Sequence, residues 1–391
     1  MILTGIVFLL ILSVLVLIHE AGHYFVAKKF GIKVEEFGFG LPPRIWGKKK
    51  GETIYSLNWL PIGGFVKLYG EDDAGAGRIE APKTTHPTKD IDRAFFSRSI
   101  GQRAAVIVAG VVMNTLLAIF IYYIFMFVGN FRTELPLLGH HTFFLVNQQV
   151  KTDILISEVS KNSPAAKAGI TPLSKLISLN GKKIVSIASF VQSVKDNKGK
   201  KIVLEWQNET SQQHHKATLV PRVSPPKNEG SLGISFFPAE TVVLSYDTPV
   251  QKVFSGITHP ADLMAYNFDV LKSLIDVSLK EKTVAPISEG VSGPVGIYSL
   301  VGTIIDIPNA KERFLQLLNL AGLLSISLAF FNVLPIPGLD GGRLFFIIIE
   351  AVFRRKVSPR IEGYAHAVGM VLLIALIILV TFKDIGQFFL K

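Results

Sequence analysis

The sequence predicts a multi-pass α-helical membrane protein that carries one additional mixed α/β domain. Of the 391 residues, 49% are hydrophobic and 18% are charged, whereas a soluble domain carries about 25% charged residues. Four apolar stretches have the length that ~30 Å of hydrocarbon requires. The net charge of +11 suggests basic loops beside an anionic leaflet before it suggests nucleic acid. The absence of cysteine excludes disulfide scaffolds, thiolate metal sites and thiol nucleophiles.

Each apolar stretch is expected to form one transmembrane helix, and the third helix is expected to be broken. The spans cover residues 1–27, 104–128, 314–353 and 362–383. No Lys or Arg precedes the first span and no small-residue cleavage site follows it, so it is expected to be retained, unlike a secretory signal peptide. Prolines and glycine interrupt the third span, and the break is expected over 335–342. Four crossings place both termini on the same side of the membrane.

Basic residues next to the spans predict the orientation. Residues 28–103 contain 14 Lys or Arg against 9 Asp or Glu. The loop before the fourth span contains Arg354, Arg355, Lys356 and Arg360. Because short loops rich in Lys and Arg stay in the cytoplasm, both loops are expected there. Both termini and the region between the second and third spans are then extracytoplasmic.

The extracytoplasmic region is predicted to contain one small folded module followed by helices. Residues 150–237 alternate between apolar and polar side chains like strands, with turn signals such as Asn180-Gly181 between them. Two helical stretches interrupt this pattern, so a mixed α/β domain is expected. Residues 238–311 are expected to form a linker and one or two amphipathic helices, since apolar side chains recur at helical spacing over 250–281. Such helices can lie on the bilayer surface.

The chemistry is predicted to lie at the end of the first span, in the sequence His19-Glu20-Ala21-Gly22-His23. Residues four apart share one face of a helix, so both imidazoles can bind one zinc ion with Glu20 beside it. Zinc lowers the pKa of a bound water towards ~7, and a nearby carboxylate can accept the proton. The alternative is an incidental polar turn at the membrane boundary. Ionisable residues inside a span are costly and usually functional, which disfavours that alternative.

His19 is predicted to lie well below the membrane surface. It precedes Lys28, the first cation that could mark the interface, by nine residues, which at ~1.5 Å each correspond to roughly 13 Å. The metal would therefore lie inside the bilayer, towards the cytoplasmic face. A soluble metalloprotease does not need this position, whereas an enzyme that cuts peptide bonds within a membrane does.

Two histidines leave zinc short of a protein ligand, and the broken third span can supply Asp340. Non-helical backbone at membrane depth persists only where it is buried in protein or lines a cavity. Gly341 and Gly342 permit unusual dihedral angles and close approach beside Asp340. Three protein ligands would leave a fourth position open for water, as in a catalytic zinc site. The alternative for Asp340 is a helix cap after a Pro/Gly turn, and His366 is expected at the membrane interface rather than as a ligand.

These motifs resemble the site-2 protease family of intramembrane zinc metalloproteases, and most closely its bacterial branch, typified by the regulator-of-sigma-E protease (peptidase family M50B). The resemblance is carried by residues 19–23 on the first span and residues 332–342 on the third. Other matching segments are Gly38-Phe39-Gly40, Pro61-Ile62-Gly63-Gly64-Phe65-Val66, Ser163-Pro164-Ala165-Ala166-Lys167-Ala168-Gly169 and Ser292-Gly293-Pro294-Val295-Gly296-Ile297. The segment Gly110-Val111-Val112-Met113-Asn114 lacks the proline that the family often has before this asparagine.

The resemblance implies a role for each motif. His19, His23 and Asp340 would bind one zinc ion per chain, and Glu20 would be the general base. Asn332 would hold the substrate or polarise its scissile carbonyl. A membrane-entering β region at 37–70 would pair with an unwound substrate by strand addition. The residues of that region implied to contact substrate are Gly38, Phe39, Gly40, Gly63 and Gly64.

The resemblance also implies a setting. The α/β module would be a PDZ-like domain outside the membrane, with Leu232-Gly233-Ile234 as the loop that binds a peptide end. The protein would reside in the cytoplasmic (inner) membrane of a bacterium, with both termini and the PDZ-like domain extracytoplasmic. Its partners would be lipid, transmembrane protein substrates and an upstream site-1-type protease, with no nucleic acid. Membrane-bound anti-sigma factors and signal-peptide remnants are examples of such substrates.

Two other functions remain alternatives to proteolysis. The first is a catalytically inactive membrane scaffold that captures peptide ends through the PDZ-like domain, although an inactive relative would typically have lost one of the four site residues. The second is a zinc carrier, which would need ligands along a path across the whole bilayer. The spans show such ligands at one depth.

Overall fold

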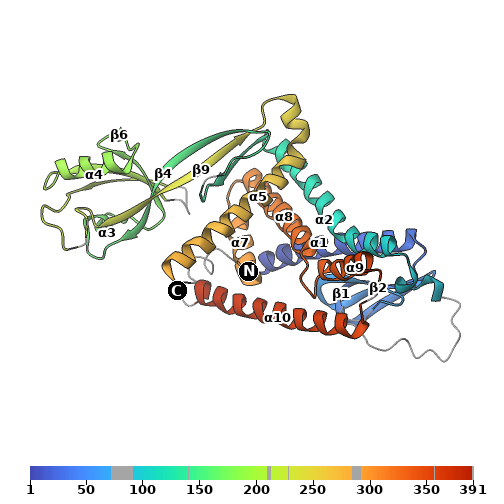
Figure 1. Cartoon of the computed structure of the whole chain (residues 1–391). Helices are drawn as coiled ribbons and strands as arrows, with labels where there is room; N and C mark the ends of the chain where they lie inside the picture. Colours follow the sequence, from blue (N-terminus) through green and yellow to red (C-terminus); the bar gives the residue numbers. More distant parts are fainter. Residues whose placement is uncertain are drawn as a thin grey trace. The chain divides into compact units, whose positions relative to one another are not determined.

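The apolar stretches of the sequence fold into long helices in the computed structural model, which describes residues 1–71, 91–139, 141–208, 213–227, 229–283, 292–355 and 357–389. The chain forms two units (Figure 1). The first unit combines Met1–Phe131 with Thr248–Lys391, and the second is Arg132–Asp247. Segments from both ends of the sequence therefore build one unit together.

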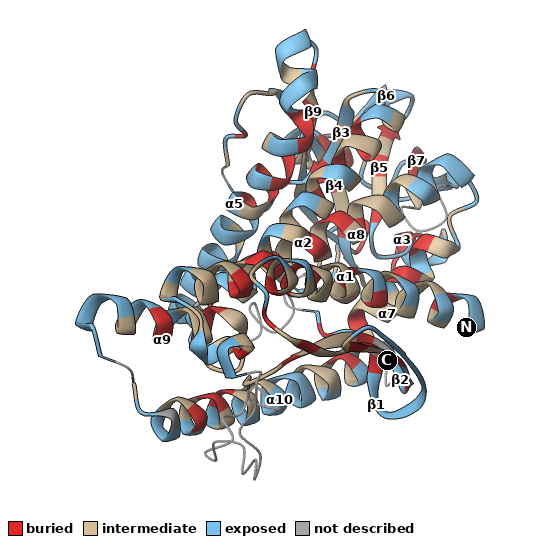
Figure 2. Cartoon of the chain, turned by 90° about the vertical axis from the view of Figure 1, so that its right-hand side faces the viewer, coloured by how far each residue is buried: buried red, intermediate tan, exposed pale blue. Residues whose placement is uncertain are grey.

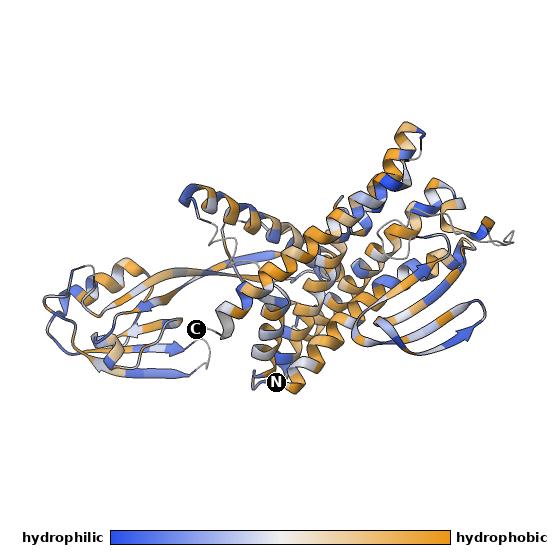
Figure 3. Cartoon of the chain, turned by 90° about the horizontal axis from the view of Figure 1, so that it is seen from below, coloured by the Kyte–Doolittle hydropathy of each residue, from blue (hydrophilic) through white to orange (hydrophobic). Residues whose placement is uncertain are grey.

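Among the described residues, four helices of the first unit are long and apolar enough to cross a membrane. They are α1 (Ile2–Lys29), α2 (Ile100–Val128), α8 (Ala310–Val333) and α10 (Pro359–Phe389). Ser99 and Gln102 form a capping box at the start of α2, and the Asn309 side chain caps α8. Figure 3 shows the long helices of this unit as predominantly hydrophobic.

The surface of α10 is apolar and largely exposed. Val371, Leu372 and Leu379 are 66%, 64% and 66% exposed. Figure 2 shows few buried residues along this helix. A continuous apolar surface of this kind is unfavourable in water, and it suits contact with lipid acyl chains.

The third apolar stretch is broken, as expected. Helix α8 ends at Val333 and α9 (Asp340–Phe353) begins seven residues later. The break is shorter than the predicted 335–342, because Gly341 and Gly342 already belong to α9. These glycines have no positive φ; they are needed because a Cβ atom would lie 2.1 Å from the Leu334 oxygen at position 341 and 2.5 Å from the Ile336 oxygen at position 342.

A β-hairpin follows α1, in the region expected at 37–70. Strand β1 (Val34–Lys50) pairs antiparallel with β2 (Thr53–Leu68). Both strands bend, so that residues 36–39 pair with 64–67 on one side and with 54–57 on the other. Residues 64–68 therefore form an edge of this sheet.

The turn of the hairpin is anchored to the end of α1. The Glu52 carboxylate accepts hydrogen bonds from Arg93 at 2.8 Å and from Lys28 at 2.5 Å. The Arg93 guanidinium and the Lys28 ammonium hold the pKa of Glu52 at about 2. The carboxylate is therefore ionised at neutral pH, and both of these cations favour that form.

The described residues of the second unit form an antiparallel sheet with two helices. Its strand order is β3-β9-β4-β5-β7-β8, and β6 pairs with β5. The strands are β3 (Arg132–Pro136), β4 (Asn147–Val159), β5 (Ser174–Leu179), β6 (Lys182–Lys183), β7 (Ile202–Asn208), β8 (His214–Leu219) and β9 (Ile234–Ser245). The helices are α3 (Pro164–Lys167) and α4 (Ile187–Asp196). Helix α4 directs Phe190 and Val194 into the core with Ile156 and Trp206.

This sheet extends beyond the boundaries 150–237 expected from the sequence. Residues 132–136 form β3, and residues 238–245, expected in a linker, continue β9. Along this extension β9 lies between β3 and β4. Val242 and Leu244 alternate with less buried neighbours, which is the strand pattern. This extension of β9 was not predicted from the sequence, because its partner strand β4 begins with polar residues.

The expected amphipathic region forms a single helix over 250–281. Helix α5 (Pro249–Glu281) has 33 residues and begins at a capping box of Thr248 with Gln251. Its buried face contacts α2, where the His259 ring stacks on Phe125. Its other face exposes apolar side chains such as Phe268. A shorter apolar helix, α7 (Pro294–Ile305), follows.

Asp384 of α10 caps α7, whose own N-cap residue, Gly293, has no side chain to do so. The Asp384 Oδ2 accepts hydrogen bonds from the N–H groups of Gly293 at 2.9 Å and Gly296 at 2.8 Å. Asp384→Ala should lower the free energy of unfolding by about 1–3 kcal/mol, because two buried donors lose their acceptor. The thermal unfolding midpoint in detergent measures this, and Asp384→Asn, which keeps an acceptor oxygen, should lose less. Equal losses in the two variants would contradict the capping role.

Candidate metal centre and active site

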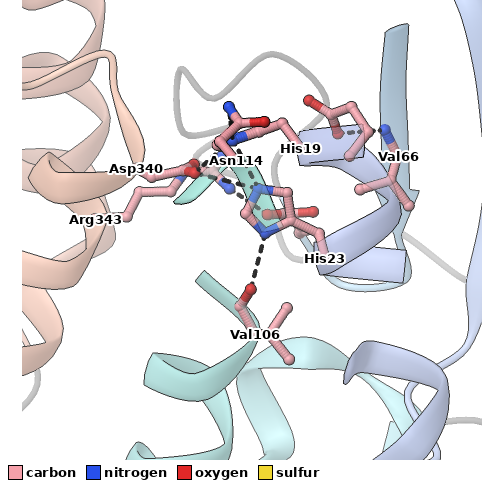
Figure 4. Close-up of polar contacts among 9 residues, drawn as sticks. His19, His23, Val66, Val106, Asn114, Asp340 and Arg343 are labelled. Carbon is pink, nitrogen blue, oxygen red and sulfur yellow. Dashed lines mark hydrogen bonds and ion pairs between the residues drawn. The ribbon is translucent and has the colours of Figure 1, made fainter. Parts of the chain in front are cut away.

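The first unit brings two imidazoles together on one turn of α1. His19 and His23 are four residues apart, so they share a face of the helix. Their Nε2 atoms lie 3.2 Å apart, and both side chains are buried. Figure 4 shows the two rings converging on one point between α1, α2 and the start of α9.

Asp340 completes the cluster from 317 residues away in the sequence, at the first position of α9. Its Oδ2 lies 3.0 Å from the His19 Nε2 and 3.1 Å from the His23 Nε2. The three ligand atoms thus lie within 4.8 Å of one another. The break after α8 positions this carboxylate, because it lets α9 start beside α1 rather than continue α8.

The chemistry of these three atoms fits a metal ion. The His23 Nδ1–H donates to the Val106 carbonyl oxygen at 2.8 Å, so the Nε2 of a neutral His23 carries a lone pair. That lone pair faces the Asp340 carboxylate, and two acceptors at this distance need a proton or a metal ion between them. Zinc holds nitrogen and oxygen ligands at about 2.0–2.2 Å in a tetrahedron, which places ligand atoms roughly 3.3 Å apart. The observed separations are close to that value.

Helix α2 packs against the imidazole rings of the two histidines and hydrogen-bonds to them. Besides the Val106 carbonyl, it supplies Asn114, whose side-chain amide lies 3.3 Å from the His19 Nδ1. Gly110 lies between Val106 and Asn114 on α2, and a Cβ atom there would be 2.5 Å from the His23 Nε2 and 2.6 Å from the His19 Cε1. Sequence reasoning assigned Asn114 no role here. The signal that could have found it is a polar side chain inside an apolar span.

Gly110→Ala should displace the imidazoles and weaken zinc binding by about tenfold or more, since real Cβ contacts do not occur at such distances. Zinc affinity measured by chelator competition tests this. Gly101→Ala in the first turn of α2 is the matched control, because a Cβ atom there would meet nothing within 4 Å. Zinc affinity that is unchanged in Gly110→Ala would mean that α2 does not pack on these rings as described.

Glu20 lies next to the cluster and lines a cavity of about 440 Å³ together with His23 and Asp340. Its Oε2 accepts a hydrogen bond from the Val66 N–H at 3.0 Å. Val66 belongs to the edge segment of β2, so this edge borders the cavity. An ion pair between Arg343 of α9 and Glu71, just after β2, forms another part of the wall.

The comparison with known protein families decides the assignment. The sequence profile of peptidase family M50 matches residues 7–376, which is nearly the whole chain. The chain belongs to peptidase family M50.

Relatives within family M50 carry metalloprotease names. A Clostridium perfringens protein named as a zinc metalloprotease is 33% identical over 380 residues, covering 96% of this chain and 97% of its own length. The regulator of sigma-W protease RasP of Bacillus subtilis is 28% identical over 456 residues, covering 99% of each. The predicted membership of the bacterial site-2 protease branch is confirmed, and the names imply zinc.

A solved PDZ domain from Listeria monocytogenes aligns with 21% of this M50 chain and 85% of its own length, at 15% identity. The TM-score of this alignment is 0.19.

The predicted substrate residues in the first unit of this M50 chain are not among the residues that line the cavity. Gly38, Phe39 and Gly40 lie in β1, and the first two pair with Phe65 and Gly64 of β2. Gly63 has a positive φ of 76° where β2 turns toward α1. Asn332 lies in the last turn of α8 and is half-buried. Their roles stay predictions.

The predicted peptide-end loop, Leu232-Gly233-Ile234, lies at the start of β9. The Gly233 N–H donates to the Gly230 oxygen at 3.0 Å, so it is already used within the unit. Gly233 has a φ of 70°, and a Cβ atom there would lie 2.3 Å from the Ser163 Cβ. Glycine is therefore required by the chain's own packing, and peptide binding stays a prediction.

His366, expected at the membrane interface, is buried within the first unit. It is 3% exposed, and its Nδ1 accepts a hydrogen bond from the Gly338 N–H at 2.9 Å. The ring thereby holds the segment between α8 and α9 that leads to Asp340. Its place in an apolar span was visible in the sequence, but its partner was not.

Proposed function

We propose that this chain is an intramembrane zinc metalloprotease of the site-2 type, which hydrolyses peptide bonds of transmembrane proteins within the bilayer. The observation that carries this proposal is the convergence of His19, His23 and Asp340 beside Glu20, at a cavity in the apolar helical unit. The names of the relatives support the metalloprotease chemistry. The long apolar helices support the membrane setting.

The depth of the cluster supports cleavage inside the membrane. His19 lies on α1, nine residues before Lys28 and ten before the helix ends at Lys29. This corresponds to roughly 13 Å from the first cation. The cytoplasmic side is assigned from the Lys- and Arg-rich loops. Both termini and the second unit would then be outside, in the cytoplasmic membrane of a bacterium.

The reaction needs a base, and Glu20 is placed to act as one. The Val66 N–H holds its Oε2, which leaves Oε1 able to accept a proton from a water molecule in the cavity. Zinc held by His19, His23 and Asp340 would supply the Lewis acidity that lets water ionise near neutral pH. Glu20 could then pass the proton to the leaving amine.

Substrate would bind as an extended strand along the edge of β2. Residues 64–68 pair with β1 on one side only, and the Val66 N–H points to Glu20 instead of into the sheet. A helical substrate hides its carbonyl groups in i→i−4 hydrogen bonds, so it must unwind before hydrolysis. Strand addition holds such an unwound backbone by main-chain hydrogen bonds. The partners would be transmembrane proteins of the anti-sigma-factor kind, trimmed first by a site-1-type protease.

An inactive scaffold that binds peptide ends is the second candidate. The second unit offers an antiparallel sheet for such binding. His19, His23 and Asp340 are nevertheless in mutual contact, and Glu20 lines the same cavity as His23 and Asp340, which a scaffold does not require.

A reporter with one membrane-spanning segment separates the two candidates. The purified chain with zinc should cut the reporter inside that segment, and a chelator should abolish cleavage until zinc is added back. Product masses locate the cut. A control reporter that carries the same cut sequence in a soluble domain should be cut far less. An intact reporter under all conditions would favour the scaffold, and cleavage in the soluble part alone would contradict the intramembrane type.

A further inference from the structure

Asn114 is a fully buried polar side chain beside the metal cluster. It is 0% exposed and lies at the centre of α2, one of the long apolar helices. Its amide lies 3.3 Å from the His19 Nδ1. Among the residues that the structure describes, no donor lies within hydrogen-bond distance of its Oδ1. A buried amide oxygen without a donor costs free energy, so a role for it must be sought.

The tautomer of His19 supplies that role. The nitrogen and oxygen of an amide are interchangeable in position, so the hydrogen-bond network must decide which one faces the imidazole. If His19 contributes its Nε2 to a metal ion, its proton must lie on Nδ1 and needs an acceptor. The Asn114 amide is the group that lies within hydrogen-bond distance of that atom. If the Asn114 side-chain oxygen faces Nδ1, that oxygen gains a donor and the His19 Nδ1–H gains an acceptor.

We infer that Asn114 is a positioning residue that accepts a hydrogen bond from the His19 Nδ1–H through its side-chain oxygen, and so orients the Nε2 of His19 toward the metal. The inference rests on the proposed metal site. It assigns to His19 the same kind of support that the Val106 carbonyl gives His23. Outer partners of this kind fix the orientation of metal-binding histidines and make them better ligands.

The geometry of α2 makes this a single template. Val106, Gly110 and Asn114 are spaced by four residues and lie on one face of the helix. The Val106 carbonyl orients His23, and Asn114 orients His19. Gly110 lets both imidazole rings approach α2 closely. The Ser325 hydroxyl of α8 donates to the Asn114 backbone oxygen at 2.8 Å, which fixes the helix at this point.

The test is zinc affinity of the purified full chain, measured by chelator competition. Asn114→Leu, which has a similar volume and no polar atom, should bind zinc about 10- to 100-fold more weakly. Asn114→Asp keeps an acceptor facing Nδ1 and should bind zinc as tightly as the wild type or more tightly. Thr115→Val is the matched control, because that hydroxyl bonds to the Val111 oxygen within α2. It should not change the affinity.

Each result has one reading. Weakened binding in Asn114→Leu with rescue in Asn114→Asp supports the inference. Equal affinity in wild type and Asn114→Leu overturns it, and so does loss in Asn114→Asp, which would mean that the amide nitrogen is needed. Should leucine prevent folding, Asn114→Ala carries the same expectation. A wild type that binds no zinc would instead refute the proposed function on which the inference rests.

Discussion

Glu20→Gln should abolish peptide hydrolysis and leave zinc bound. Glutamine has nearly the same shape but cannot accept the proton of the attacking water, and loss of a general base typically costs about 10²–10⁴-fold in rate. The hydrogen bond from the Val66 N–H can still be made to the amide oxygen, so the local structure should persist. Cleavage of the membrane-spanning reporter measures the rate, and metal analysis measures the zinc.

Glu134→Gln is the matched control for loss of a carboxylate. Glu134 lies in the second unit, and its ion pair with Lys151 is exposed on both sides, so it contributes little to stability. The control should cleave the reporter like the wild type. Turnover of Glu20→Gln close to the wild-type rate would remove Glu20 from the role of base. Loss of zinc in that variant would instead make it a ligand.

The membrane helices could be predicted because length and hydropathy determine them almost alone. Spans expected at 104–128 and 362–383 lie within α2 and α10, whose ends are set by capping residues and polar loops beyond the apolar run. Helix boundaries of this kind move by a turn without changing the fold. The strands of the second unit beyond 150–237 were missed because their pairing is long-range and the start of β4 is polar.

The candidate site was predictable in part for a different reason. His19 and His23 share a helical face by spacing alone, and the Pro/Gly break marked Asp340 as non-helical backbone in an apolar stretch. The contribution of α2 could not be read in this way. Hydropathy does not specify which face of an apolar helix meets its neighbour, so the Val106 carbonyl, Gly110 and Asn114 became visible only once α1 and α2 were packed.

Asp340→Asn and His23→Ala should each remove most of the bound zinc. Each change takes away one of three protein ligands, and the asparagine also lacks the charge that balances the ion. The affinity should fall by more than the 10- to 100-fold typical of a change behind the ligands, so roughly 100-fold or greater is expected. Zinc content after dialysis against a weak chelator measures the loss, and reporter cleavage should fall with it.

Asp196→Asn is the control for this comparison, because Asp196 lies at the end of α4 in the second unit and pairs with Gln192. It should retain one zinc ion per chain. One full equivalent of zinc at wild-type affinity in both ligand variants would refute the three-ligand site. Zinc lost in His23→Ala but kept in Asp340→Asn would leave the two histidines as ligands and return Asp340 to the simpler role of starting α9. Because all three ligand atoms lie 3.0 to 3.2 Å from one another, none of them is peripheral to the cluster, and we expect the two losses to be similar.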